Sequence, residues 1–223
     1  MDEIVTCEAQ ELVVAKHFKA LMANIYCRQI NKEAITILVT SCYHNEGKSW
    51  TCANLATSFS NINKKVLLID LDLKNGKQAE KFKVKSTPGL SDILQGNMPF
   101  TKSSISKYIK RTKITNLSVI PAGNLPSNSL ELLFSSNFED LLKILKPDYN
   151  AIILDGTPAI LDSDSMLLTK MVDNTIIVTA VNKVTRGDLI KLKKSIENAG
   201  GKITGVVLNK IPSKIKNTER KIR

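Results

Sequence analysis

Long apolar runs alternate with segments of helical periodicity along most of the chain. Residues Ala34–Ser41 (AITILVTS) are β-branched and almost continuously apolar, which is typical of a strand buried on both faces of a sheet. Residues Glu8–Ile30 instead carry apolar side chains at helical spacing and predict one N-terminal helix within residues 1–30. Runs like the first predict five further strands, at Lys64–Leu73, Asn116–Gly123, Asn150–Gly156, Asn174–Val181 and Ile203–Asn209.

Helical patterns fall between most of the predicted strands. They cover Lys48–Phe59, Leu130–Leu145, Ser165–Met171 and Gly187–Ala199, while the polar, lysine-rich region Asn75–Thr115 is expected to hold connecting helices and loops. Apolar strands that alternate with helices predict an α/β fold, with a mostly parallel sheet covered by helices on both faces. Ligands bind beyond the carboxyl ends of the strands in such sheets, so the residues just after each strand are the candidates for function.

The composition is that of an ordinary globular protein. The 223 residues are 43% hydrophobic and 24% charged, so we predict a single domain over residues 1–223 with a large core. No apolar run reaches the ~18 residues of a membrane span, and the start MDEIVTCEAQ lacks the features of a signal peptide. These patterns favour a cytoplasmic protein. The cysteines Cys7, Cys27, Cys42 and Cys52 form no CxxC pair, so we expect reduced thiols rather than a zinc site.

Basic residues exceed acidic ones, and part of the excess lies at the end of the chain. The counts of 32 basic and 21 acidic residues give a net charge of +11, and residues 211–223 form a basic tail that is expected to be flexible. Such a tail can contact an anionic membrane surface or nucleic acid, or it can be a solvated terminus. Aromatic residues make up only 5% and form no stripe with basic ones, so no nucleic-acid partner is expected.

The loop after the first predicted strand carries the run EGKS directly before a predicted helix. A glycine, a lysine and a hydroxyl at a helix N-terminus are the components of a phosphate-binding loop with magnesium, although GKS in a surface turn with an exposed lysine is the alternative. Glycine is absent earlier in the loop, but asparagine tolerates a positive φ and can replace it. The strand–loop–helix context favours nucleotide binding, by Asn45, Glu46, Gly47, Lys48, Ser49 and Trp50.

Polar residues also follow three other predicted strands. Asp70 and Asp72 end the second strand, and period two places them on one side of the chain, where they suit magnesium binding and activation of a hydroxyl, unless one caps the next loop. Asp155 ends AIILD, which is typical of a Walker B element. Asp164 lies at a predicted helix start, where an N-cap role competes with a functional one. Asn209 follows the sixth strand; its amide could contact a purine, or it could simply form a turn.

In their order along the chain these motifs resemble those of the bacterial tyrosine kinases, or BY-kinases, of capsule and exopolysaccharide systems. The resemblance covers about residues 15–212. It implies a P-loop NTPase fold and transfer of phosphate from ATP, with Mg²⁺, to a protein tyrosine. It also implies the split form of the family, in which the cytoplasmic tail of a membrane adaptor activates a soluble kinase. The motifs that carry it are EGKSWTCANLA, LLIDLDLK, PGLSDILQG, IPAGNLPSNSLELL, IILDGTP and GVVLN.

The resemblance implies a role for each candidate residue. Lys48 and Ser49 would hold phosphates and magnesium. Asp70 and Asp155 would be catalytic and metal-linked acids, and Asp72 would orient the tyrosine hydroxyl. The side-chain amide of Asn209, after the sixth strand, would bind the adenine. The protein would then work in the cytoplasm, or peripherally at the inner face of the cell membrane through the adaptor.

Two departures from the family pattern affect partners. The family builds a ring-shaped homo-oligomer with a Glu-xx-Arg-xx-Arg motif in its first helix, but the matching positions here hold Lys16, Lys19 and Met22. Without those ion pairs we expect the ring to be weak or absent. The family also ends in a cluster of phosphorylated tyrosines, whereas the last tyrosine here is Tyr149. We therefore expect no autophosphorylation of the tail.

Two other functions remain as alternatives. A ParA- or MinD-like ATPase switch shares the Walker elements, but it would have a lysine four residues before Gly47, where this chain has Tyr43. An ATP-binding regulatory pseudokinase would keep the nucleotide site and act by binding partners. The protein substrate and the adaptor cannot be read from the residues.

Overall fold

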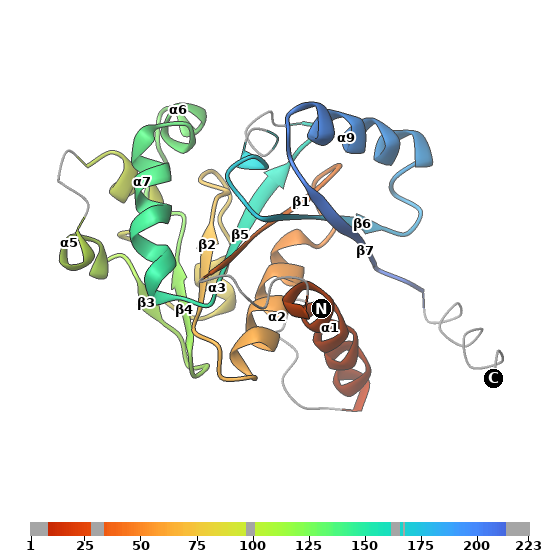
Figure 1. Cartoon of the computed structure of the whole chain (residues 1–223), viewed down its shortest axis with the longest axis horizontal. Coiled ribbons are helices and arrows are strands. Elements are labelled where there is room, and N and C mark those ends of the chain that lie inside the picture. The colour runs from red at the N-terminus through yellow and green to blue at the C-terminus, as the bar shows by residue number, and fades with distance from the viewer. Residues whose placement is uncertain (1–8, 28–33, 97–100, 162–165, 167, 213–223) are drawn as a thin grey trace.

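A seven-stranded sheet forms the centre of the molecule (Figure 1). The computed structural model describes residues 9–27, 34–96, 101–161, 166 and 168–212. The strands are β1 (Ile35–Ser41), β2 (Val66–Asp70), β3 (Lys110–Arg111), β4 (Leu117–Ile120), β5 (Ala151–Pro158), β6 (Asn174–Ala180) and β7 (Ile203–Asn209).

The strands lie in the order β3-β4-β2-β5-β1-β6-β7. Every neighbouring pair is parallel except β3 with β4, which is antiparallel. All six predicted strands therefore form. The seventh, β3, was not expected, because two residues in a region predicted to hold helices and loops are too short to show a period.

Helices connect the strands and cover the sheet. The prediction of one helix over Leu130–Leu145 is wrong, because Ser135 has an extended backbone (φ −67°, ψ 151°) and divides the segment into two helices. The candidate Asp164 lies outside the described residues, as do residues 165 and 167 of the predicted helix Ser165–Met171. Within that segment Met166 and Leu168 are helical, whereas residues 169 and 170 form a turn, so the helix ends earlier than predicted. The helices are α1 (Ala9–Cys27), α2 (Lys48–Ser60), α3 (Gln78–Lys81), α4 (Leu90–Leu94), α5 (Lys102–Ser106), α6 (Ser129–Leu133), α7 (Ser136–Leu145), the 3₁₀ turn Lys146–Asp148 and α9 (Arg186–Asn198).

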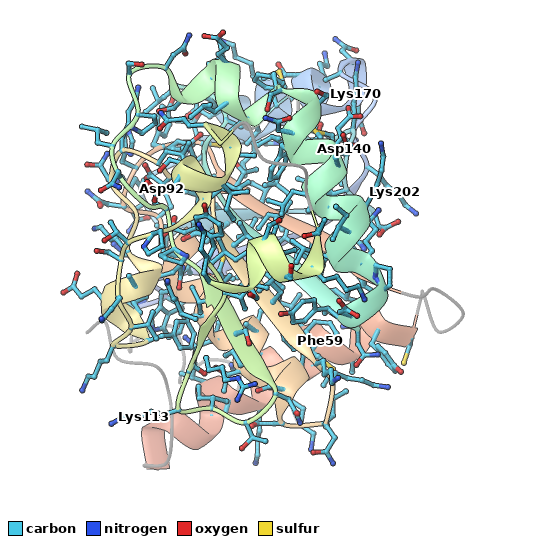
Figure 2. All side chains as sticks on the ribbon, turned by 90° about the vertical axis from the view of Figure 1, so that its left-hand side faces the viewer. Phe59, Asp92, Lys113, Asp140, Lys170 and Lys202 are labelled. Carbon is cyan, nitrogen blue, oxygen red and sulfur yellow. The ribbon has the colours of Figure 1, made fainter. Side chains whose placement is uncertain are left out.

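Each face of the sheet has its own apolar core, because alternate strand residues point to opposite sides. In β1, Ile37 and Val39 contact the core under α1 and α2, whereas Leu38 belongs to the core under α4 and α7. All seven residues of β1 are buried, as its continuous apolar run predicts. Side chains fill the space between the sheet and the helices (Figure 2).

The N-terminal helix α1 packs on α2 rather than on the sheet alone. Its buried residues Phe18, Met22 and Ile25 share one core with α2. The ring of Phe18 meets that of Trp50 edge-on, with centroids 5.2 Å apart. This contact fixes α1 beside the first turn of α2, which immediately follows the predicted phosphate loop.

One packing contact joins two of the motifs that resemble the family, PGLSDILQG and IPAGN. The carboxylate of Asp92, labelled in Figure 2, accepts hydrogen bonds from the Gly89 N–H (2.7 Å) and the Asn124 Nδ2 (2.6 Å). A Cβ at Gly89 would lie 2.4 Å from the Pro121 carbonyl oxygen, so only glycine fits there. PGLSDILQG therefore docks against IPAGN by backbone contact, and its role in the described structure is to place α4.

Within the residues that the structure describes, no helix is both long enough and apolar enough to cross a membrane. The parallel pairing instead brings the carboxyl ends of β1, β2, β5, β6 and β7 to one edge of the sheet. The candidate residues named from the sequence follow these strands, so they gather at that edge.

We expect Phe138→Ala to lower the free energy of unfolding by about 3–5 kcal/mol, because it removes a fully buried ring from the core beneath α7. Urea denaturation of the purified protein measures this difference. Leu125→Ala is the control, since Leu125 is 72% exposed and its truncation should change stability by less than about 0.5 kcal/mol. Equal stabilities of the two variants would contradict the assignment of this core.

Candidate active site

The loop between β1 and α2 has the backbone of a phosphate-binding nest. Gly47 caps α2 in a left-handed conformation (φ 99°, ψ 23°), and Asn45 also has a positive φ of 60°. Alternating left-handed residues of this kind turn successive N–H groups toward one point. Asn45 thus takes the conformation for which it was expected to replace glycine. Another residue at Gly47 would be strained by the φ of 99°, and its Cβ would displace the Asn209 amide, whose Nδ2 would lie 1.9 Å away.

Lys48 begins α2 and is only 8% exposed. A surface turn with an exposed lysine, the alternative for this loop, is therefore wrong. Ser49 follows and is half-buried, and its side chain hydrogen-bonds to Asp155. The Trp50 ring packs on Phe18 and so contributes to the contact between α1 and α2, and its predicted role in nucleotide binding stays a prediction.

Asp70 and Asp155 form a buried carboxylate pair. Asp70 ends β2 and Asp155 is the fifth of the eight residues of β5; the register of the two strands pairs them directly, and each is 1% exposed. Burial raises the pKa of both carboxyls, and for Asp70 the negative charge of Asp155 raises the pKa further. Hydrogen bonds and the positive charge of Lys48 act in the opposite direction on Asp155. Two carboxyls that resist ionisation together are well suited to share a nearby cation.

Gln78 joins this pair and was missed from the sequence. Its backbone N–H donates to the Asp70 Oδ2 (2.9 Å), and its Nε2 donates to the Asp155 Oδ2 (2.7 Å) and the Ser49 carbonyl (2.9 Å). The residue is fully buried at the start of α3. A glutamine in a polar connecting region carries no sequence signal of such a role, because only the fold brings it between two strand ends.

Asp72 has a different environment from the buried pair. The strand β2 ends at Asp70, so the period-two argument that placed both side chains together does not extend to Asp72. Its Oδ1 accepts the N–H of Asn75 at 2.9 Å, which is the loop-capping arrangement considered as the alternative. Asp72 is half-buried and close enough for its charge to raise the pKa of Asp70, after burial and Asp155. Its catalytic role stays a prediction.

Glu46 and Asn209 hold the loop to the neighbouring strand ends. The buried carboxylate of Glu46 accepts hydrogen bonds from the backbone N–H groups of Tyr43 (2.5 Å) and Ala180 (3.2 Å). Asn209 donates from its Nδ2 to the Glu46 carbonyl oxygen at 2.9 Å. The Glu46 side chain is thus used inside the loop, and only its backbone can serve a phosphate. The predicted contact of Asn209 with adenine stays a prediction.

The donor set suits a magnesium ion that keeps most of its water. Among the described residues no cluster of three or more His, Cys, Asp or Glu side chains could hold a metal by itself. Mg²⁺ commonly binds one or two protein groups together with waters and substrate phosphates, and Ser49 beside Asp155 supplies such a pair. The buried Gln78 Oε1 also has no hydrogen-bond partner in the described part of the chain, and it could accept from a metal-bound water.

Comparisons with known proteins identify the family. A family model described as an AAA domain matches residues 37–204. The tyrosine-protein kinase CpsD of Streptococcus pneumoniae is 33% identical over 198 residues, which cover 88% of this chain and 84% of the relative. The chain belongs to the bacterial tyrosine kinase family. The resemblance noted in the sequence motifs is thereby confirmed.

Solved structures agree with this family. The chimerical protein CapA2B2 matches with a TM-score of 0.81 and 30% identity, covering 89% of this chain and 85% of that chain. The kinase domain of the Escherichia coli tyrosine kinase ETK matches with a TM-score of 0.80 and 25% identity, over 89% and 78% of the two chains. The cell division ATPase MinD of Pyrococcus furiosus has a TM-score of 0.67 at 24% identity, which shows the shared fold. The predicted P-loop NTPase fold is confirmed.

We expect the thermal stabilisation by Mg-ATP to decrease as the pH is lowered from neutral toward about 4, the ordinary pKa of an aspartate. The raised pKa values of Asp70 and Asp155 mean that the folded protein binds protons more tightly than the unfolded chain. Protonation therefore stabilises the free protein as the pH falls through these pKa values, while it removes the charges that attract Mg²⁺. Differential scanning fluorimetry with and without Mg-ATP measures the difference in Tm.

The pH series needs two variants as controls. Asp70→Asn removes one member of the pair and should flatten the pH dependence of the Mg-ATP effect. Asp140→Asn removes an exposed carboxylate on α7, and it should leave that dependence unchanged. A Mg-ATP effect that is equal at both ends of the pH range in the unmodified chain would count against a carboxylate-held cation.

Proposed function

We propose that this protein is an ATP- and Mg²⁺-dependent protein-tyrosine kinase that regulates the synthesis of a capsular or exopolysaccharide. The observation that carries the proposal is the buried pair Asp70–Asp155 beside the Lys48–Ser49 loop, in a chain of the bacterial tyrosine kinase family. Such a site places carboxylates, a lysine and a hydroxyl around one region at the carboxyl end of the sheet. These are the groups that phosphoryl transfer requires.

Each residue has a proposed role in the transfer. Lys48 and the N–H groups of the loop bind the outer phosphates of ATP, and Ser49 with Asp155 holds Mg²⁺. The metal, when bound, supplies positive charge to the phosphates. Asp72, with Asp70 behind it, orients the tyrosine hydroxyl and accepts its proton as the phosphoryl group moves to the tyrosine oxygen and ADP leaves. Asp72 is half-buried, so it can face both the pair and a protein substrate.

The acceptor tyrosine is proposed to lie on another protein. The chain contains four tyrosines, all before residue 150. Tyr26, Tyr43, Tyr108 and Tyr149 are each partly buried in the fold, and Tyr149 packs against the core under α7. A membrane adaptor of the polysaccharide co-polymerase type is the proposed activating partner. It would hold the kinase at the inner face of the cell membrane.

A regulatory pseudokinase is the second candidate function. It is supported by the hydrogen bond that commits the Asp72 Oδ1 to the Asn75 N–H. If Asp72 remained a loop cap when ATP is bound, the site would hold nucleotide without activating a hydroxyl. The MinD-like switch has less support, because Tyr43 stands where its additional lysine would be.

A single assay separates these functions. The full chain is incubated with Mg-ATP and a tyrosine-containing protein, with and without the cytoplasmic tail of a capsule-assembly adaptor, and both phosphotyrosine and free phosphate are measured. We expect phosphotyrosine that depends on the adaptor, and we expect Lys48→Met to reduce it by about 10²-fold or more. Lys113→Met, at an exposed position outside the site, is the control. Free phosphate without phosphotyrosine would support the ATPase switch. The absence of both phosphotyrosine and free phosphate would support the pseudokinase.

We expect the purified protein to form no stable ring in sedimentation velocity experiments at micromolar concentration. Lys16 and Lys19 are exposed on α1 and line a hollow against α2, so two positive charges stand where the family has an acid and a base. Met22 is 4% exposed and cannot offer a surface charge at all. Lys16→Glu with Met22 unchanged tests whether the acid alone strengthens association. A stable octamer of the unmodified chain would contradict this expectation.

A further inference from the structure

Three consecutive carbonyl groups of the phosphate loop are each held by a side chain from another part of the fold. The donors are Lys183, Asn209 and Lys210, which follow or end the adjacent strands β6 and β7. The hydrogen bonds are Lys183 Nζ to His44 O (2.7 Å), Lys210 Nζ to Asn45 O (2.8 Å) and Asn209 Nδ2 to Glu46 O (2.9 Å).

The two lysines reach the loop because of the way their strands end. Lys183 follows Asn182, which has a φ of 61°, and Lys210 itself has a φ of 55°. Each left-handed residue turns the chain sharply after a parallel strand, at the edge of the sheet where the loop lies. The Val181 N–H donates to the Asn209 carbonyl oxygen at 3.1 Å, so the two turns are joined to each other. The lysines thus come from one corner of the sheet.

The geometry of the peptide group gives these contacts a consequence for phosphate binding. In a trans peptide the C=O of one residue points away from the N–H of the next. Donors on the carbonyls of residues 44, 45 and 46 therefore orient the N–H groups of residues 45, 46 and 47 in the opposite direction. A charged donor also polarises the peptide and strengthens the hydrogen bond that its N–H can give.

The loop has a particular need for such support. It contains one glycine, Gly47, between residues 42 and 48, and Asn45 holds a left-handed conformation that is unfavourable for a residue with a side chain. A loop of this composition would relax unless other contacts determine its shape. The buried Glu46 carboxylate supplies support from inside, and the corner of β6 and β7 supplies it from outside.

We propose that Lys183 and Lys210 are positioning residues of the nucleotide site, which hold the outer carbonyls of the phosphate loop so that its N–H groups face the phosphates. This inference rests on the proposed function, since it requires the loop to bind nucleotide. Lys48 remains the lysine that contacts phosphate, whereas Lys183 and Lys210 act through the backbone. Their two ammonium groups stabilise a loop shape that the residues of the loop do not stabilise by themselves.

The test measures the Kd of the full chain for Mg-ATP and for Mg-ADP by isothermal titration calorimetry. We expect Lys183→Met and Lys210→Met each to weaken both nucleotides by about three- to tenfold, and the double variant by about 10–100-fold. The factor should be the same for ATP and ADP, because the shape of the loop affects every phosphate it binds. Lys183→Arg and Lys210→Arg keep a charged donor and should recover most of the affinity.

Controls separate positioning from stability and from general charge. Lys202→Met removes an exposed lysine at the opposite end of β7, and it should leave both Kd values unchanged. The Tm of each nucleotide-free variant should stay within about 2 °C of the unmodified chain, since each lost contact is exposed. One result would overturn a positioning role: the methionine variants lose both affinity and Tm, and the arginine variants do not recover the affinity.

Two further outcomes would overturn the inference. Methionine variants that bind both nucleotides as tightly as the unmodified chain would show that the contacts do not matter for the loop. A much larger loss for ATP than for ADP would show that the lysines bind the outermost phosphate directly. An unmodified chain that binds no Mg-ATP would overturn the proposed function as well, so the two failures are distinguishable.

Discussion

The structure depends on two carboxylates that the sheet buries next to each other. The parallel register of β2 against β5 pairs Asp70 with Asp155, and each is 1% exposed. Burial raises the pKa of both groups, and the charge of Asp155 adds to the effect on Asp70. A buried pair of like charges is unfavourable unless hydrogen bonds or a cation compensate for it. The elements around the strand ends provide that compensation.

Gln78 provides hydrogen bonds and Lys48 provides positive charge, and both reach the pair from helices that begin beside it. Gln78 binds both carboxylates and the Ser49 carbonyl, so it links α3 to the phosphate loop. Lys48 is nearly buried at the first position of α2, where its charge lowers the pKa of Asp155. These contacts offset only part of the repulsion between the two carboxylates, and a bound Mg²⁺ would relieve the rest. The same repulsion is the physical reason for proposing a cation at this site.

Most of the fold follows from local pattern. Strands such as β1 and β2 were predictable because strands buried on both faces must be continuously apolar, and this signal needs no tertiary information. The edge strand β7 carries a similar apolar run, although Val206 and Leu208 are exposed in the structure. The short edge strand β3 and the break at Ser135 were not predictable, since two residues show no period and an extended serine leaves the apolar spacing intact on both sides. Membership of the bacterial tyrosine kinase family was likewise predictable, because its motifs lie at strand ends in one order.

The sequence by itself determined the phosphate loop, the acids after the strands and the parallel sheet that brings them together. These features depend on residue type and on chain neighbours: a glycine and a lysine before a helix, or an aspartate after an apolar run. Only the tertiary structure decided which aspartates form the buried pair, that Gln78 joins them, and that Lys183 and Lys210 hold the loop. The physical reason is the distance along the chain. Lys183 and Lys210 lie 139 and 165 residues from the carbonyls that they bind, and strand order rather than local pattern sets that contact.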